Sequence, residues 1–162
     1  LNALNNTWSS AANMSGPRSE LSSVSFNNTV VIIGGYDGSA YLSSCLQYHP
    51  STNTFSSFPS LNTARAQFAA AVVLNKIYVA GGQQPVGLSS IEVFSFSWTT
   101  LPTSLAATRY LCAAVPLKDK LIILGGTRTT TEVYDPSTSS MSSNLPSMTT
   151  QPFRVFLSAV SF

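Results

Sequence analysis

The side chains best suited to chemistry in this sequence are one histidine, two cysteines and a set of recurring arginines. His49 is the only histidine, and it follows Cys45 by four residues. In an extended strand this spacing places both side chains on one face, where an imidazole and a thiol can form a nucleophilic pair or part of a metal site. Neither a third ligand nor an orienting acid accompanies them, so a packed thiol and a turn residue are the favoured interpretation. No catalytic residue, metal site or cofactor is predicted.

The arginines recur in one setting, after a proline and a short turn. Arg65 ends FPSLNTAR, Arg109 ends LPTSLAATR, and Arg18 follows an earlier turn. Arg154 ends LPSMTTQPFR, but its spacing differs, so only the first three are taken as repeat arginines. Guanidinium groups gathered on one face can bind carboxylates or phosphates bidentately. The favoured alternative is that each guanidinium ties its own turn and the neighbouring unit together through backbone carbonyls.

Other signatures of catalysis are missing from the sequence. It has no paired carboxylates, no phosphate-cradling glycine loop and no nucleophile elbow of the G-x-S-x-G type. The segment is therefore not expected to be an enzyme.

The composition is that of a folded, weakly charged chain. Hydrophobic residues make up 44% of the 162 residues and charged residues 9%, with a formal net charge of +2. This composition argues against disorder, and the scattered basic residues argue against a nucleic-acid partner. The longest apolar run, near 68–74, is too short to span a bilayer, so no membrane span is predicted.

Three N-glycosylation sequons begin at Asn5, Asn13 and Asn27. They favour a secreted, extracellular glycoprotein, with a cytoplasmic protein as the alternative because so many Asn, Ser and Thr residues produce sequons by chance. The sequence starts at Leu1 without an initiator methionine or leader, so a mature or truncated piece is expected. Cys45 and Cys112 fall in different predicted strands, and no disulfide between them is expected.

Glycine doublets recur roughly every 45 residues, an interval typical of propeller blades or solenoid units. Each doublet ends an apolar, β-branched run, as in VVIIGG, IYVAGG and LIILGG; the glycines are Gly34, Gly35, Gly81, Gly82, Gly125 and Gly126. Two adjacent glycines weaken a strand, so a chain keeps them where a side chain does not fit or where φ is positive.

Other features recur in phase with the doublets. A polar turn and an apolar strand precede each one, and a short strand ending in an aromatic residue follows, at Tyr48, Phe94 and Tyr134. A further bulky residue then opens a fourth strand. Each unit thus predicts four short antiparallel strands, a to d, with units near 21–59, 66–102 and 110–146 and lone strands near 3–10 and 155–162. A two-layer β-sandwich is the alternative all-β fold.

The repeated string resembles the kelch repeat: an apolar run, a glycine doublet, TEVYDP or LQYHP, a bulky residue, Leu-Pro and Arg. The resemblance covers nearly the whole chain and implies an incomplete kelch-like β-propeller of about three four-stranded blades plus a stray strand at each end. Two departures stand out. The middle unit has FSFSW, which shortens (clips) its c–d hairpin. The third unit has Met141 where the family usually has Trp.

The resemblance implies that neighbouring strands and the next blade crowd the glycine doublets. Three blades do not close a ring, because propellers usually have four to eight, and an open arc exposes edges and apolar faces. We therefore expect missing residues of a longer chain, or another chain, to complete the ring.

The resemblance also implies a non-catalytic protein-interaction scaffold, built on a rigid framework with variable b–c loops. The candidate partner-binding residues in these loops are Tyr36, Asp37, Tyr41, Gln83, Gln84 and Arg128. The main alternative is a secreted carbohydrate-binding or carbohydrate-active propeller with catalytic residues outside this segment. A galactose oxidase-type copper site needs two histidines, which this segment does not have. An intracellular ubiquitin-ligase adaptor is a third possibility.

Overall fold

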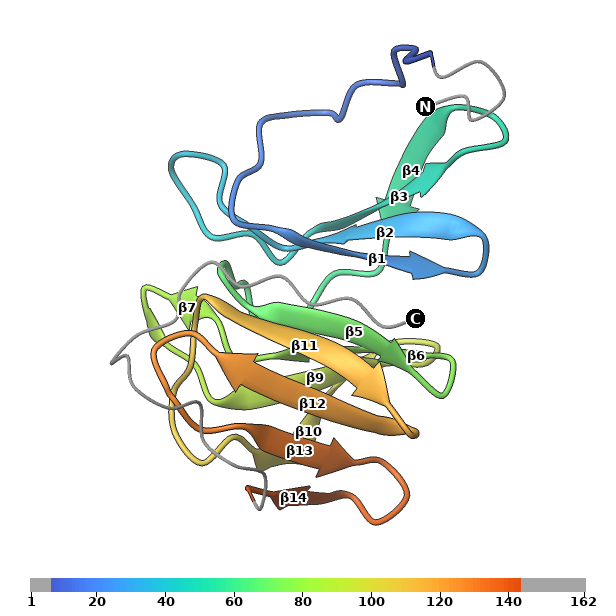
Figure 1. The fold of residues 1–162 in the computed structure, drawn as a ribbon. Helices are drawn as coiled ribbons and strands as arrows, with labels where there is room; N and C mark the ends of the chain where they lie inside the picture. The colour runs from blue at the N-terminus through green and yellow to red at the C-terminus, as the bar shows by residue number, and fades with distance from the viewer. Residues whose placement is uncertain (1–6, 144–162) are drawn as a thin grey trace.

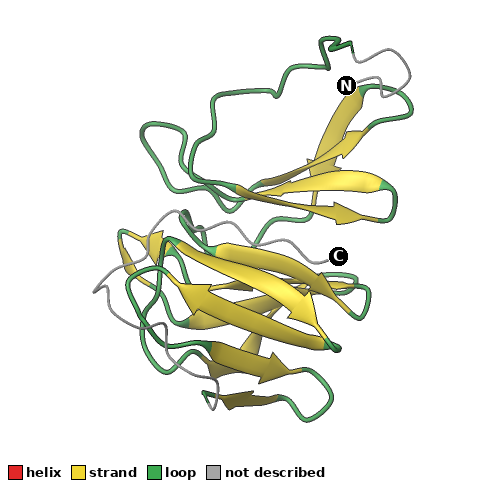
Figure 2. Ribbon diagram, in the orientation of Figure 1, coloured by secondary structure: helices red, strands yellow, loops and turns green. Residues whose placement is uncertain are grey.

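The computed structural model describes residues 7–143, and within them every regular element is a β-strand. The strands form three four-stranded antiparallel sheets, each built from one sequence repeat (Figures 1 and 2). Strand order within each sheet follows the chain, apart from a small two-stranded ribbon in a loop of the second sheet. The prediction of an incomplete β-propeller with about three four-stranded blades is confirmed.

The bounds of the strands show the same a–b–c–d meander in each blade. The first blade contains β1 (Ser22–Phe26), β2 (Thr29–Ile33), β3 (Cys45–His49) and β4 (Thr54–Phe58). The second contains β5 (Ala69–Val73), β6 (Lys76–Ala80), β9 (Ser90–Phe94) and β10 (Trp98–Ser104), with the ribbon β7 (Gln83–Gln84) and β8 (Val86–Gly87). The third contains β11 (Cys112–Leu117), β12 (Lys120–Gly125), β13 (Glu132–Asp135) and β14 (Ser140–Ser142).

The a–b turns explain how these short strands pair in register. Each turn has two successive residues with positive φ: Asn27 and Asn28, Leu74 and Asn75, and Lys118 and Asp119. Two left-handed central residues define the type I′ turn, whose twist matches that of the strands it joins. Asn and Asp tolerate this conformation better than most residues, so the turn chemistry fixes each hairpin.

The hydrophobic core consists of two layers, each enclosed between neighbouring sheets. The layer between the first and second blades includes Val31, Ile33, Phe68, Ile77 and Val79. The layer between the second and third includes Ala71, Tyr78, Ile91, Leu121 and Ile123. Strand a of the second blade contacts strand a of both neighbours, so the a strands lie along the inner side of the arc.

Some expectations lie partly or wholly outside the described residues. Of the lone strand expected near 3–10, the structure describes residues 7–10, where Thr7 forms an isolated bridge. The lone strand near 155–162, Arg154 and Asn5 lie outside the described part. Over residues 7–143, no helix has the length and hydrophobicity needed to cross a membrane.

Candidate functional site

The glycine doublets lie where backbone from two blades converges. An added Cβ would lie 2.6 Å from the carbonyl oxygen of Arg65 at Gly34 and 2.2 Å from that of Arg109 at Gly81. In these two doublets the second glycine donates its N–H to the same oxygen, Gly35 to that of Arg65 and Gly82 to that of Arg109, both at 2.8 Å. The first glycine therefore makes room for the arginine carbonyl of the next blade, and the second binds it.

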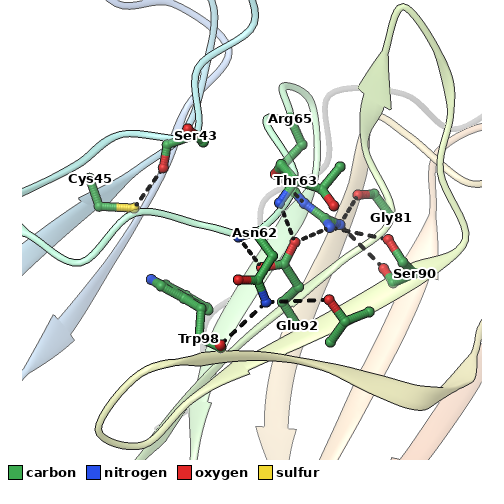
Figure 3. Close-up of polar contacts among 10 residues, drawn as sticks. Ser43, Cys45, Asn62, Thr63, Arg65, Gly81, Ser90, Glu92 and Trp98 are labelled. Carbon is green, nitrogen blue, oxygen red and sulfur yellow. Dashed lines mark hydrogen bonds and ion pairs between the residues drawn. The ribbon is translucent and has the colours of Figure 1, made fainter.

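The guanidinium of Arg65 is fully buried within the second blade (Figure 3). Its Nη1 donates to the carbonyl oxygens of Gly81 (2.7 Å) and Ser90 (3.2 Å), and its Nη2 to the Ser90 hydroxyl (3.1 Å). An ion pair with Glu92 follows at 2.6 Å, with both side chains inaccessible to solvent. Burial lowers the pKa of Arg65, and the Glu92 carboxylate opposes that shift.

The Glu92 carboxylate also fixes the turn that leads into the second blade. It accepts backbone N–H groups from Asn62 at 2.8 Å and Thr63 at 3.0 Å, both in the chain that leaves the first blade (Figure 3). The Arg65–Glu92 pair thus connects strands b and c of one blade to the connection from the previous blade.

The third blade repeats this arrangement. Arg109 donates to the carbonyl oxygens of Gly125 (3.1 Å) and Thr130 (2.7 Å) and pairs with Glu132 at 3.0 Å. Glu132 in turn accepts the N–H of Ala106 at 2.8 Å. Because Arg65 and Arg109 are fully buried and paired with glutamates inside the blades, they do not present an anion-binding ring to solvent.

The first blade keeps the arginine but has no glutamate at the matching position of strand c. Arg18 donates to the carbonyl oxygens of Gly34 (2.7 Å) and Ser44 (2.6 Å) and to the Ser44 hydroxyl (2.9 Å). Leu46 occupies the position that Glu92 and Glu132 hold in the other blades, two residues before the aromatic of strand c. Arg18 is half-buried, and this burial lowers its pKa, while Cys45 and Asp37 act in the opposite direction.

Sequence reasoning identified the three arginines but missed Glu92 and Glu132. The sequence does contain a pattern that indicates these two residues, since IEVF and TEVY both place a glutamate two residues before the aromatic residue of strand c. A charged residue in the middle of an apolar strand is nearly always paired, and the recurring arginine was the available partner.

The predicted contact residues of the first blade form one cluster. The rings of Tyr36 and Tyr41 lie 5.3 Å apart, and the hydroxyl of Tyr36 donates to the carbonyl of Gly38 at 3.0 Å. Asp37 Oδ1 accepts the N–H groups of Ser39 and Ala40, both at 2.8 Å, and these hydrogen bonds lower the pKa of Asp37. The b–c loop of the first blade is therefore a closed turn with two tyrosines on it.

The b–c loops of the other two blades meet at a different place. Gln83 and Gln84 are half-buried in the β7–β8 ribbon, whose Gly87 lies against the side chain of Thr108. Arg128 is exposed, and its Nε donates to the carbonyl oxygen of Thr108 at 3.3 Å. Both loops thus contact the turn that leads into the third blade.

Sequence comparison supports the assignment that this geometry suggests. A kelch motif profile matches residues 17–62 and 64–104, which are more than half of the chain. The chain belongs to the kelch-repeat family. Its third kelch repeat, which the profile does not reach, still forms a four-stranded blade with the same buried Arg–Glu pair.

The curated relatives of this kelch chain include proteins from animals, plants and a virus. It is 29% identical to mouse Kelch-like protein 35 over 136 residues, which cover 81% of this chain and 24% of that protein. It is 32% identical to an F-box/kelch-repeat protein of Arabidopsis thaliana, over 69% of this chain and 27% of that protein. It is 28% identical to the Kelch repeat protein M-T8 of Myxoma virus, over 75% and 25%. The chain spans about a quarter of the length of these relatives.

Neither cysteine of the kelch blades has the setting of a nucleophile. Cys45 and Cys112 are buried and unpaired with each other. Burial raises the pKa of both thiols, that of Cys112 to about 11, whereas reactive cysteines have lowered values. His49 Nε2 lies 2.9 Å from the Ser56 hydroxyl at the exposed end of strand c. Among residues 7–143, no three His, Cys, Asp or Glu side chains gather in a possible metal site.

Two of the predicted sequon asparagines, Asn13 and Asn27, are exposed, the second in the a–b turn of the first kelch repeat. The hydroxyl of Thr29 in its sequon donates to the carbonyl of Phe26 at 2.7 Å. Glycosylation, and the extracellular location that it would imply, stay predictions.

Proposed function

We propose that this chain is a non-catalytic protein-interaction segment, part of a larger chain or assembly, that binds partner proteins through its b–c loops. The observation that carries the proposal is the contrast between a repeated framework and variable loops. The glycine, arginine and carbonyl contacts recur from blade to blade, whereas the loops between strands b and c differ in length, sequence and conformation. Variable loops on a rigid framework are where recognition residues usually lie.

The loop residues are of the types that anchor interfaces. Tyr36 and Tyr41 provide an aromatic pair, Val86 is exposed on the ribbon and Arg128 is exposed beside it. Aromatic residues and arginine are enriched at energetically important interface positions. The first-blade cluster and the cluster around Thr108 both lie on b–c loops, which are at the same end of the blades (Figure 1). The names of the relatives, which combine kelch repeats with an F-box in plants, also support a role in protein assembly.

A site-specific photo-crosslinking experiment tests this proposal. A photoreactive amino acid is placed at Tyr41 or Arg128, and as a control at Lys118, which is exposed in an a–b turn at the other end of the blades. In cells that express the protein, we expect discrete protein adducts from the two loop positions and none from Lys118. Loss of the Tyr41 adduct in a Tyr36→Ser variant of unchanged melting temperature would link it to the tyrosine cluster. The same adducts from all three positions, or none from the loops, would contradict the proposal.

A further inference from the structure

A groove lies between the first and second blades at the end opposite to the b–c loops. Its volume is about 530 Å³, within the range of ligand-binding pockets. Its lining combines five apolar side chains, one cation and four polar residues: Phe26, Phe58, Leu74, Phe94 and Phe96, then Lys76, then Asn27, Gln47, Asn75 and Ser95. Since the a–b turns of both blades and the c–d turn of the second line it, the groove is separate from the loops of the proposed partner surface.

The floor of the groove is a cluster of phenylalanines from both blades. The ring of Phe94 lies 4.6 Å from Phe58 and 6.1 Å from Phe26, measured between ring centroids. Phe26 and Phe94 are both 7% exposed, so their rings are fixed by the core around them. The a–b turns on the rim, at Asn27 and Asn75, have the left-handed backbone of tight hairpins. The groove is therefore a preformed surface, which lowers the entropic cost of binding.

The clipped c–d hairpin of the second blade places an aromatic side chain at the edge of this groove. The turn Ser95–Phe96–Ser97 closes on itself, with Ser95 N–H donating to the Ser97 carbonyl at 3.4 Å, and Phe96 is 96% exposed. In the third blade the longer turn reaches its neighbour, because Ser139 O accepts the Thr103 hydroxyl at 2.9 Å. Of the five exposed large hydrophobic residues in the described part, Leu74 and Phe96 both line the groove.

Lys76 gives the groove a charge that the blade itself does not neutralise. It precedes Ile77, which pairs with Phe94, and Ser95 follows Phe94; in the third blade, Lys120 and Asp135 flank the Leu121–Tyr134 pair in the same way. Lys120 and Asp135 form an ion pair. With serine in place of the aspartate, Lys76 has no ion pair among residues 7–143, and no other charged residue lines the groove.

We propose that this groove binds an extended segment of a partner protein in which a bulky apolar side chain adjoins an acidic residue. The apolar side chain rests on the Phe26, Phe58 and Phe94 cluster and against Phe96, and the carboxylate pairs with Lys76. An apolar anchor surrounded by polar groups is the usual arrangement of an interface hot spot. The groove goes beyond the proposed function of the b–c loops, because it is a second binding surface with its own specificity.

Capped peptides with defined side chains test the groove on the whole chain. The probes are Ac-Gly-Trp-Glu-Gly-NH₂, its Trp-Gln and Trp-Lys counterparts, and an Ala-Glu peptide without the apolar anchor, followed by nitrogen-15 NMR at low salt. We expect the Trp peptides to shift the amide signals of Lys76, Ser95 and Phe96. The Trp-Glu peptide should bind about two- to fivefold more tightly than the Trp-Gln peptide, as for an exposed ion pair. The Ala-Glu peptide should bind at least tenfold more weakly.

Three variants assign the binding to named residues. Ser95→Asp gives Lys76 the partner that Lys120 has, so it should remove the preference for Glu over Gln. Phe96→Ser should weaken every Trp peptide severalfold with little change in melting temperature, because the ring is exposed. Leu117→Ser, which removes an exposed apolar residue of the third blade that does not line the groove, should leave the peptide affinities unchanged.

Three results would overturn the proposal. One is the absence of shifts at the groove at 10 mM peptide. The second is equal affinity of the wild-type protein for the Trp-Glu and Trp-Gln peptides. The third is unchanged binding of the Trp peptides by the Phe96→Ser variant. Shifts of the same signals with protein concentration alone would assign the groove to a second copy of the chain instead. None of these results bears on the loop crosslinks, so the two proposals can fail separately.

Discussion

The first blade and the two that follow have the same hydrogen-bond framework but a different electrostatic interior. In the second and third blades, Arg65 and Arg109 are fully buried and each is paired with a glutamate of strand c. In the first, Arg18 reaches the equivalent carbonyl oxygens of Gly34 and Ser44, but Leu46 stands where the glutamate would be.

This difference distinguishes the contacts that all three blades share from the contacts that only two blades add. The contacts from the arginine side chain to backbone carbonyls occur in all three blades, so they belong to the local geometry of the repeat. The carboxylate is present in two blades only, where it also binds the N–H groups of the preceding turn. We infer that the glutamates attach a blade to the connection from its predecessor, and that the first blade has a weaker attachment at this point.

The largest effect is expected from removing a buried guanidinium. Arg65→Met leaves the Glu92 carboxylate buried without its cation, which should lower the free energy of unfolding by about 3–5 kcal/mol. Arg18→Met removes hydrogen bonds to partly exposed carbonyls and strands no carboxylate, so its cost should be about 1 kcal/mol. Urea denaturation of both variants measures the difference.

A double variant provides the control for this comparison. Arg65→Met combined with Glu92→Met removes both charges and should recover a large part of the lost stability, as for other buried pairs replaced by apolar residues. Equal losses for Arg65→Met and Arg18→Met would show that the carboxylate does not distinguish the blades.

The glycine doublets should respond alike in the blades that differ in charge. Gly34→Ala and Gly81→Ala each place a Cβ less than 3 Å from an arginine carbonyl of the next blade. Non-glycine residues such as Leu74 and Leu111 already adopt comparable positive φ values in this chain, so crowding rather than φ is the main penalty. Overpacking predicts a cost of about 1–3 kcal/mol at both positions.

The matched control is Gly16→Ala, where an added Cβ meets nothing within 4 Å. Thermal denaturation of the three variants should show two large decreases in melting temperature and one small change of either sign. A loss at Gly81 with none at Gly34 would mean that the first blade is not held against the second by this contact.

Most of the fold could be predicted because its signals are local and repeated. The doublets, the polar a–b turns and the aromatics of strand c each fix a short stretch of backbone, and three copies in phase gave the four-stranded blade. The turn pairs Asn27–Asn28 and Lys118–Asp119 show why, since residue type and backbone conformation agree there.

The candidate sites were harder to predict because they depend on contacts between repeats. Glu92 meets Asn62 across thirty residues of sequence, and no local pattern specifies that approach. The clipped FSFSW hairpin was visible in the sequence as a departure. The short hairpin leaves Phe96 exposed beside the phenylalanines of the first blade. This placement depends on how the two sheets face each other.

The smallest expected effect comes from giving the first blade the carboxylate that it does not have. Leu46→Glu places a carboxylate at the strand-c position from which Glu92 pairs with Arg65, and we expect it to pair with the Nη2 group of Arg18, which donates to the Ser44 hydroxyl. Because this arginine is half-exposed, the pair should contribute about 0.5–1 kcal/mol. The loss of the half-buried leucine opposes this gain, so the single variant alone does not report it.

A double-mutant cycle of Leu46→Glu and Arg18→Gln isolates the coupling from the loss of the leucine. If the first blade differs from the others only in this side chain, the coupling energy is favourable and decreases with added salt, since the pair is accessible to screening ions. A coupling energy of zero would mean that Leu46 and Arg18 do not face each other as Glu92 and Arg65 do. The difference between the blades would then lie in their backbone rather than in one residue.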